Sequence, residues 1–285
     1  MVDLHTHTKA SDGQYSPAEL VQKAADKGIS VLAITDHDTV SGLTEGKKAA
    51  DKAGITFLPG IELNIEWPTG EFHLLGLGFK QVSSELQSVI DELQKNRAAR
   101  NHSIVEKMNA DGIEVTFDDI QNMFPGRSLG RPHFAAFLVE RKIVKNRQQA
   151  FDKYLAKGRP WYADRTGADL DEAVEAIKTS GGVPVLAHPL SLYVSWGKIE
   201  EVLKNIRNKG VSGLEAWHPG ARVVECERLE ETAKKLGFFV TAGSDFHGES
   251  IRADRRLGHT AGDCKIDDRF WTAELQPFLS YIHEK

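Results

Sequence analysis

Seven short runs of apolar, β-type residues recur along this chain of 285 residues, and most of them are separated by segments with helical patterning. Strands that alternate with helices are typical of βα units and a parallel sheet. We therefore predict an α/β protein whose strands form a closed or nearly closed barrel. The expected strands are a first one from Val2, then Ser30–Thr35, Ile55–Leu63, Phe72–Phe79, Val183–His188, Gly213–Trp217 and Phe238–Gly243.

The first helix has clear start and stop signals. Ser16 stands where an N-cap is expected, Pro17 suits the first helical position, and Glu19 completes a capping box. Gly28 follows at the expected end of the helix. A second helix is expected to end near Gly54.

The alternation of strands and helices stops between Phe79 and Val183, where only helical patterns occur. One long helix is expected over residues 83–109, and shorter ones near 117–124, 132–141 and 146–157. We expect residues 80–163 to form a helical subdomain inserted into a barrel made of residues 1–79 and 164–285.

Composition indicates an ordinary globular protein. Apolar residues make up 40% of the chain and charged residues 27%. No apolar run approaches the ~20 residues that span a bilayer, so no membrane partner is expected. A first strand at Val2 leaves no room for a leader peptide. With only Cys226 and Cys264, a reducing compartment and a cytoplasmic location are expected.

Charge is distributed unevenly along the chain. Residues 80–163 contain 14 Lys and Arg against 10 Asp and Glu, which gives this segment a charge of +4. Because the net charge of the whole chain is −5, the remaining residues carry −9. A net negative protein does not attract nucleic acid in bulk. An acidic body with a mildly basic insert favours a small or short anionic substrate over a long duplex.

Histidines and carboxylates gather at the ends of the expected strands. The first strand leads into D-L-H-T-H-T and S-D-G, and the others lead into I-T-D-H-D, G-I-E-L, L-A-H-P and G-S-D-F-H-G, while the histidine of E-F-H-L-L-G comes somewhat earlier in its strand. In parallel βα folds the carboxyl ends of the strands carry the functional side chains. The residues placed there are His5, His7, Asp12, His37, Glu62, His73, His188, Asp245 and His247.

This set of donors is suited to divalent metal ions. Imidazole and carboxylate without thiolate fit Zn, Mn or Fe, and the pattern does not choose among them. Nine ligands are more than one ion uses, so two or three ions are expected, with Glu62 able to bridge a pair. Clustered divalent ions generate a hydroxide nucleophile and stabilise a phosphoryl group during its transfer.

These motifs, in this order and over nearly the whole chain, resemble the PHP (polymerase and histidinol phosphatase) family of metal-dependent phosphoesterases. The resemblance implies a distorted seven-stranded (β/α) barrel with a trinuclear metal site. It also implies three ligand sets, with Glu62 shared. The sets are His5, His7, Glu62 and Asp245 for one ion, Glu62, His73 and His188 for the second, and Asp12, His37 and His247 for the third.

Two departures from the histidinol phosphatases indicate a branch of the family. Those proteins tend to have a histidine at the position of Asp12 and lack the helical insertion. The S-D-G motif with an inserted G-R-P-H-F-A resembles the branch that acts on nucleotides. Members of that branch remove the 3′-phosphate of nucleoside 3′,5′-bisphosphates or trim short 5′-phosphorylated RNA from its 5′ end, and both substrates remain open here.

The catalytic positions are assigned to Glu62, His188 and Asp245, and substrate contacts to Arg131, His133 and His218. A guanidinium at the Gly-Arg-Pro-His turn can bind phosphate with two parallel hydrogen bonds. Two other functions remain as alternatives. One is a phosphatase of a small sugar or amino-alcohol monophosphate, and the other is a non-catalytic binding module stabilised by metal. The sequence leaves the oligomeric state open.

Overall fold

The computed structural model describes residues 1–164 and 166–284, and it divides into two compact units. One unit comprises Met1–Ile90 together with Ala168–Lys285, and the other comprises Asp91–Gly167. Sequence analysis placed the insertion at residues 80–163. The long helix α3, Ser84–Ala110, belongs to both units, because its first turns bury Leu86 and Ile90.

The first unit is a seven-stranded sheet in sequential order. Its strands are β1 (Val2–Asp3), β2 (Val31–Ile34), β3 (Thr56–Ile65), β4 (Phe72–Leu77), β5 (Val183–Leu186), β6 (Gly213–Trp217) and β7 (Phe239–Ala242). The sheet nearly closes, because the segments that follow β1 and β7 run side by side. There the Asp245 amide donates to the His5 carbonyl at 2.9 Å, and the His7 amide donates to the Phe246 carbonyl at 2.9 Å. The predicted seven-stranded α/β barrel is confirmed.

Strand β4 departs from the expected parallel sheet. It pairs antiparallel with both β3 and β5, while the other neighbouring strands pair in parallel. Only residues 66–71 separate β3 from β4. A connection this short makes a hairpin, whereas a parallel pair needs a crossover of a dozen residues or more. The expectation of a wholly parallel sheet was therefore wrong at β4.

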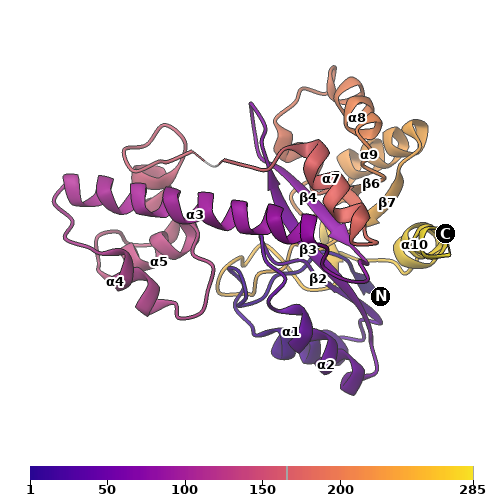
Figure 1. Ribbon diagram of the computed structural model, residues 1–285, viewed down its shortest axis with the longest axis horizontal. Helices are drawn as coiled ribbons and strands as arrows, with labels where there is room; N and C mark the ends of the chain where they lie inside the picture. Colours follow the sequence, from indigo (N-terminus) through magenta and orange to yellow (C-terminus); the bar gives the residue numbers. More distant parts are fainter. Residues whose placement is uncertain (165, 285) are drawn as a thin grey trace. The chain divides into compact units, whose positions relative to one another are not determined.

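Helices cover the strands of this unit, and α9 packs against β6 and β7 (Figure 1). Their bounds are α1 (Pro17–Asp26), α2 (Leu43–Ala53), α7 (Leu170–Thr179), α8 (Ile199–Asn208), α9 (Val223–Leu236) and α10 (Gln276–His283). Shorter elements are the helical turns η2 (Pro189–Leu192), η3 (Ala261–Asp263) and η4 (Phe270–Leu275), with the strand pair β8 (His259–Thr260) and β9 (Cys264–Lys265). None of the elements after β7 was predicted from the sequence.

Local signals position α1 as expected. The Ser16 side chain accepts from the Glu19 amide, and the Glu19 carboxylate accepts from the Ser16 amide, which satisfies two amides at the helix start. Gly28 has a φ of +75°, a value that favours glycine, and so the chain turns away from the helix there. The inner face of α1 buries Leu20, Val21 and Ala24 against residues such as Leu32 of β2.

The second unit is helical. After the greater part of α3 it contains α4 (Phe117–Met123), α5 (Arg131–Glu140), α6 (Arg147–Ala150) and the turn η1 (Phe151–Leu155). Its own apolar core includes Met108, Phe134, Leu138 and Trp161. The Trp161 indole stacks on Tyr154 at 4.0 Å between ring centroids and donates to Asp111 Oδ2 at 2.6 Å. Among the described residues of the whole chain, no helix is both long and apolar enough to cross a membrane.

A partly buried carboxylate fastens the C-terminal segment to the rest of the first unit. Glu230 of α9 accepts two hydrogen bonds from the Arg269 guanidinium, at 2.9 and 2.8 Å, and one from the Trp217 indole. Burial raises the pKa of Glu230, but the hydrogen bonds from Arg269, Lys234 and Trp217 outweigh it and hold the pKa at about 2. Because the folded state lowers this pKa, the stabilisation is present above the ordinary value of 4.5 and is lost as the pH falls towards 2.

We therefore expect Glu230→Gln to lower the free energy of unfolding at pH 7 by about 1 kcal/mol, because a partly exposed charged pair is worth little more. Urea unfolding of both proteins between pH 7 and pH 3 measures the difference, which should shrink below pH 4.5. Glu231→Gln, at the next and exposed position of α9, is the matched control. A difference that stays constant with pH would contradict the assigned pairing.

Candidate metal centre

Nine side chains predicted from the strand ends as metal ligands meet in the first unit. They form four groups in which one nitrogen or oxygen from each member lies within 4.8 Å of those of the others. The groups are His7, Asp12, His37 and His247; His5, His7 and Asp245; His5, Glu62 and His188; and His37, Glu62 and His73. Because neighbouring groups share members, the nine residues form one continuous cluster.

The two histidines of D-L-H-T-H-T enter this cluster from the segment after β1. Both are buried, and their Nε2 atoms lie 3.1 Å apart. Thr6 between them bridges to Phe246, so the segment is extended there. Side chains alternate along an extended chain, and His5 and His7 therefore point to the same side.

Glu62 lies at the centre of the cluster with a side chain that is 0% exposed. Its Oε1 atom lies 2.9 Å from His73 Nδ1 and 3.0 Å from His188 Nε2. Its Oε2 atom faces a different set of rings, namely His37 Nδ1 at 3.0 Å, His7 Nε2 at 3.2 Å and His5 Nε2 at 3.3 Å. One carboxylate thus presents each of its oxygens to a separate group of imidazoles.

The antiparallel direction of β4 explains why His73 comes early in its strand. The β3–β4 register pairs Asn64 with His73 and Glu62 with Leu75. His73 and Leu75 share one face of β4, so His73 is the diagonal neighbour of Glu62 on that face. In a strand of reversed direction, the first residues lie at the sheet edge where the parallel strands end.

The buried carboxylate of Asp36 holds the S-D-G loop in the place where Asp12 reaches the cluster. Asp36 is not itself a member of any of the four groups. Asp36 accepts from the Thr8 amide at 2.7 Å and from the Ser11 hydroxyl at 2.6 Å, which ties the loop to the end of β2. Asp12 Oδ1 then lies 3.3 Å from His247 Nε2. Sequence analysis did not include Asp36 among the site residues.

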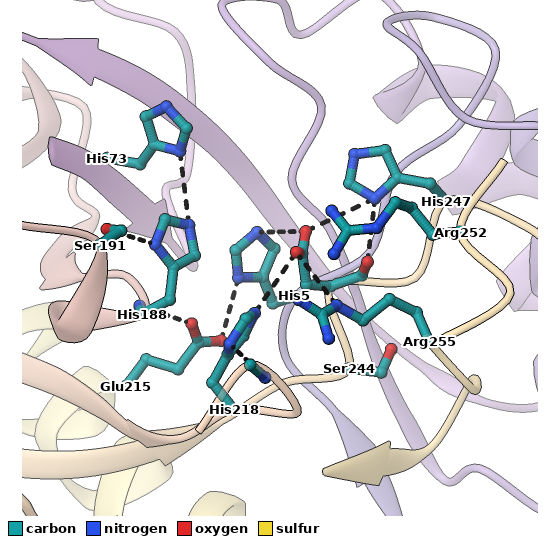
Figure 2. A network of polar contacts seen from close by, with 12 residues as sticks. His5, His73, His188, Ser191, Glu215, His218, Ser244, His247, Arg252 and Arg255 are labelled. Carbon is teal, nitrogen blue, oxygen red and sulfur yellow. Dashed lines mark hydrogen bonds and ion pairs between the residues drawn. The ribbon is translucent and has the colours of Figure 1, made fainter. Parts of the chain in front are cut away.

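Glu215 and Asp3 are supporting carboxylates that sequence analysis missed. Glu215 Oε1 accepts from His5 Nδ1 at 3.0 Å, and its Oε2 accepts from the His188 amide at 2.9 Å (Figure 2). A proton on Nδ1 leaves His5 Nε2 available to a metal, as is common for metal-binding histidines. Asp3 accepts from the hydroxyl and amide of Ser244, beside Asp245. The signal for Glu215 was a lone acid in the strand G-L-E-A-W.

His218 and Asp245 meet at the edge of the cluster. His218 Nε2 lies 3.3 Å from Asp245 Oδ2, and its Nδ1 accepts from the Gly220 amide at 3.0 Å. Burial lowers the pKa of His218, which keeps its ring neutral at neutral pH. The predicted substrate contact His218 therefore lies against a predicted metal ligand.

Burial and charge set the protonation of the cluster. Burial lowers the pKa of His7, but its close polar contacts with the carboxylates of Asp245 and Glu62 outweigh it and raise the pKa to about 10. Burial raises the pKa of Glu62 and of Asp245, but the surrounding histidines outweigh it and hold both pKa values well below the usual range. At neutral pH the carboxylates are ionised, and protons on histidine provide part of the positive charge that a divalent ion would otherwise supply.

The donor set fits divalent metal ions. Every member of the four groups is a histidine or a carboxylate. Asp12 Oδ1 and Glu62 Oε2 are buried and face imidazole nitrogens at 3.0–3.3 Å, but among the described residues none of these contacts has the geometry of a regular hydrogen bond. Buried carboxylate oxygens are rarely left in this state, and a cation is the partner that such oxygens at the centre of a histidine cluster would accept.

Arg131 and His133, the other two predicted substrate contacts, lie at the start of α5 in the second unit. The Arg131 guanidinium lies over the Tyr162 ring, 5.4 Å from its centroid. His133 is 4% exposed, and its Nδ1 accepts from the Gly130 amide at 3.0 Å. His133 thus caps the first turn of α5, a structural role that sequence analysis did not assign to it.

Comparison with known proteins places these features in a family. A family model described as PHP domain matches residues 3–157. A 3′,5′-nucleoside bisphosphate phosphatase of Chromobacterium violaceum is 32% identical over 91% of each chain. A 5′-3′ exoribonuclease of Haemophilus influenzae is 32% identical over 86% of this chain and 89% of its own. The solved structure of an amidohydrolase from Chromobacterium violaceum superposes with a TM-score of 0.84, at 29% identity, over 99% of this chain and 96% of its own.

The central place of Glu62 leads to a prediction about metal content. Glu62→Gln should lower the number of divalent ions bound per folded chain, because one neutral amide oxygen cannot bridge two cations. Elemental analysis after reconstitution measures the ions, and circular dichroism shows whether the barrel is intact. Glu175→Gln, at an exposed carboxylate of α7, is the control and should keep the wild-type content. An unchanged metal content in a folded Glu62→Gln protein would remove Glu62 from the centre.

Proposed function

Because this chain belongs to the PHP domain family, we propose that it is a metal-dependent phosphoesterase acting on a small nucleotide. The proposed reaction removes the 3′-phosphate of a nucleoside 3′,5′-bisphosphate or releases the 5′-terminal nucleotide of short RNA. The observation that carries the proposal is the convergence of nine histidine and carboxylate side chains around Glu62. Similarity to a nucleoside bisphosphate phosphatase and to an exoribonuclease supports a nucleotide substrate.

The cluster would hold two to three divalent ions, Mn, Fe or Zn. The ligand sets proposed from the family resemblance overlap with the groups that lie together but do not coincide with them, because His73 and His188 of the second set lie in two separate groups that share Glu62. One set is His5, His7, Glu62 and Asp245; the second is Glu62, His73 and His188; the third is Asp12, His37 and His247. When bound, such ions supply a hydroxide nucleophile and neutralise charge that develops on the phosphoryl group.

The side chains of the protein would orient these ligands and the substrate. Glu215 holds the His5 ring through Nδ1 and the His188 backbone through its amide, so both rings keep their Nε2 atoms near Glu62. This pre-organisation removes the need to rearrange donors during the reaction. Glu62, His188 and Asp245 are proposed to lie closest to the phosphoryl group that is cleaved.

Arg131 and His133 are proposed to bind the phosphate that is not cleaved, and residues 80–163 to act as the lid or substrate-binding subdomain. A guanidinium binds phosphate through two parallel hydrogen bonds. The Tyr162 ring beneath Arg131 supports this side chain through a cation–π contact. The local charge of +4 over residues 80–163 favours an anionic ligand in that part of the chain. A cytoplasmic location is proposed as well, and the free thiols of Cys226 and Cys264 support it.

A substrate panel distinguishes the possible reactions. Released inorganic phosphate from a nucleoside 3′,5′-bisphosphate supports the phosphatase, and a released mononucleotide from 5′-phosphorylated RNA supports the exoribonuclease. Activity confined to a sugar or amino-alcohol monophosphate would replace the nucleotide proposal by that alternative. A metal-loaded protein that cleaves no phosphate ester would support the other alternative, a non-catalytic binding module.

The role of Arg131 can be tested by comparing two substrates. Arg131→Ala should lower kcat/KM roughly 10- to 150-fold on a nucleoside 3′,5′-bisphosphate, because a charge-assisted bond to phosphate contributes ~1.5–3 kcal/mol. On an aryl monophosphate, which has no second phosphate, the change should matter little. Arg131→Lys should restore only part of the loss, because an ammonium lacks the planar fork.

Arg141→Ala, at the exposed C-terminal end of α5, provides the control for this experiment. Equal losses by Arg131→Ala on both substrates would assign Arg131 to the cleaved phosphoryl group or to folding. No loss on either substrate would leave Arg131 with a purely structural role at the start of α5.

A further inference from the structure

The loop that follows His247 carries two arginines that converge on one carboxylate. Arg252 Nε and Nη2 bind the two oxygens of Asp254 at 3.1 and 3.0 Å. Arg255 Nη1 lies 3.0 Å from Asp254 Oδ2, so that oxygen is shared by both guanidiniums. The Asp254 side chain is 58% exposed. Two positive side chains therefore surround a single anion position that is open to solvent.

Arg255 also extends inward from this anion position to the metal centre. Its side chain is 8% exposed, and its Nε atom lies 3.6 Å from Asp245 Oδ2. Nε is buried and makes no hydrogen bond to a described residue. Figure 2 shows both arginines beside His218 and His247. The Arg255 guanidinium thus separates the anion position from Asp245. The anion position therefore lies outside the cluster of candidate metal ligands.

The position suits a phosphate next to the one being cleaved. The cleaved phosphoryl group has to contact the metal ions held by the cluster of candidate ligands. An anion on the far side of the Arg255 guanidinium is too remote for that role, yet it adjoins the cluster. The planar fork of N–H donors on a guanidinium binds phosphate oxygens as it binds the oxygens of a carboxylate. An exposed carboxylate held by hydrogen bonds to side chains can be displaced by such a ligand.

We propose that Arg252 and Arg255 bind the phosphodiester that follows the cleaved one in a 5′-phosphorylated oligoribonucleotide, and that Asp254 occupies their anion position in the free protein. This inference rests on the proposed function and adds that the substrate extends beyond a single nucleotide. A nucleoside bisphosphate has no group that could occupy this site. Arg252 and Arg255 would therefore select for RNA ends over the bisphosphate.

Arg252→Gln is the informative variant, because the Arg252 side chain is 40% exposed and lies farther from Asp245 than Arg255 does. Its kcat/KM on a 5′-phosphorylated trinucleotide should fall about tenfold more than its kcat/KM on a nucleoside 3′,5′-bisphosphate. Arg252→Lys should recover part of this difference. Asp254→Asn should lower KM for the trinucleotide, because the competing carboxylate is neutralised.

Arg256→Gln is the matched control. Arg256 lies in the same loop, is 57% exposed, and pairs with Asp263 at 2.8 Å instead of with Asp254. Its loss on the trinucleotide should equal its loss on the bisphosphate. Both arginine variants retain the other charges of the loop, so a difference between them reports on the anion position and not on net charge.

Binding without turnover gives an independent readout. Fluorescence anisotropy of a labelled 5′-phosphorylated trinucleotide on metal-stripped protein should show a salt dependence that reflects the number of phosphates contacted. Arg252→Gln should reduce the slope of log K against log salt by about 0.7, the value for one phosphate of a single strand. Arg256→Gln should leave the slope unchanged.

Equal losses by Arg252→Gln on the two substrates, or no loss on either, would overturn this inference and leave the phosphoesterase proposal intact. A wild-type enzyme that cleaves only the bisphosphate would overturn it as well. Failure of the wild-type protein to act on either substrate would instead contradict the proposed function. The wild-type measurements separate the last two results from each other, and the comparison with Arg252→Gln decides the first.

Discussion

A carboxylate buried at the centre of the barrel, that of Glu62, imposes the main constraint on this structure. An ionised carboxylate without a partner is very costly to bury, because it loses its hydration. Five imidazole rings approach its two oxygens within 3.3 Å, and they come from four separate segments of the chain. The strand ends therefore have to converge on one point, and the near closure of the sheet accomplishes this.

The rings in turn depend on carboxylates that lie behind them. Glu215 connects the end of β1 to the start of η2, because it binds His5 Nδ1 and the His188 amide. Asp3 connects the start of the barrel to Ser244, and Asp36 connects β2 to the S-D-G loop. Alternating layers of imidazole and carboxylate balance charge in this buried region. Removing one member would leave buried charges on its neighbours.

Much of this arrangement could be predicted from the sequence, because apolar runs identify strands and the ends of parallel strands share one edge. The apolar periodicity did not indicate the direction of β4, since it is the same for both directions. Only the short link of residues 66–71 carried that information. Glu215 and Asp3 were missed for another reason. Their roles depend on partners distant in the chain, His188 and Ser244, and no local pattern reports such contacts. His133 shows the converse, because its capping bond to Gly130 is local and could have been inferred.

Hydrogen bonds within the barrel unit also fasten both ends of the helical insertion. The outgoing chain is held where the amides of Lys80 and Ser83 bind Ser180, and the returning chain is held where Ala168 exchanges bonds with Asn64 and Glu66. Strands β4 and β5, which flank the insertion in the sequence, pair directly with each other. Six of the nine candidate ligands precede the insertion and three follow it. The length of the segment between β4 and β5 is therefore not constrained by the pairing of these two strands, and the positions of the candidate ligands do not depend on it.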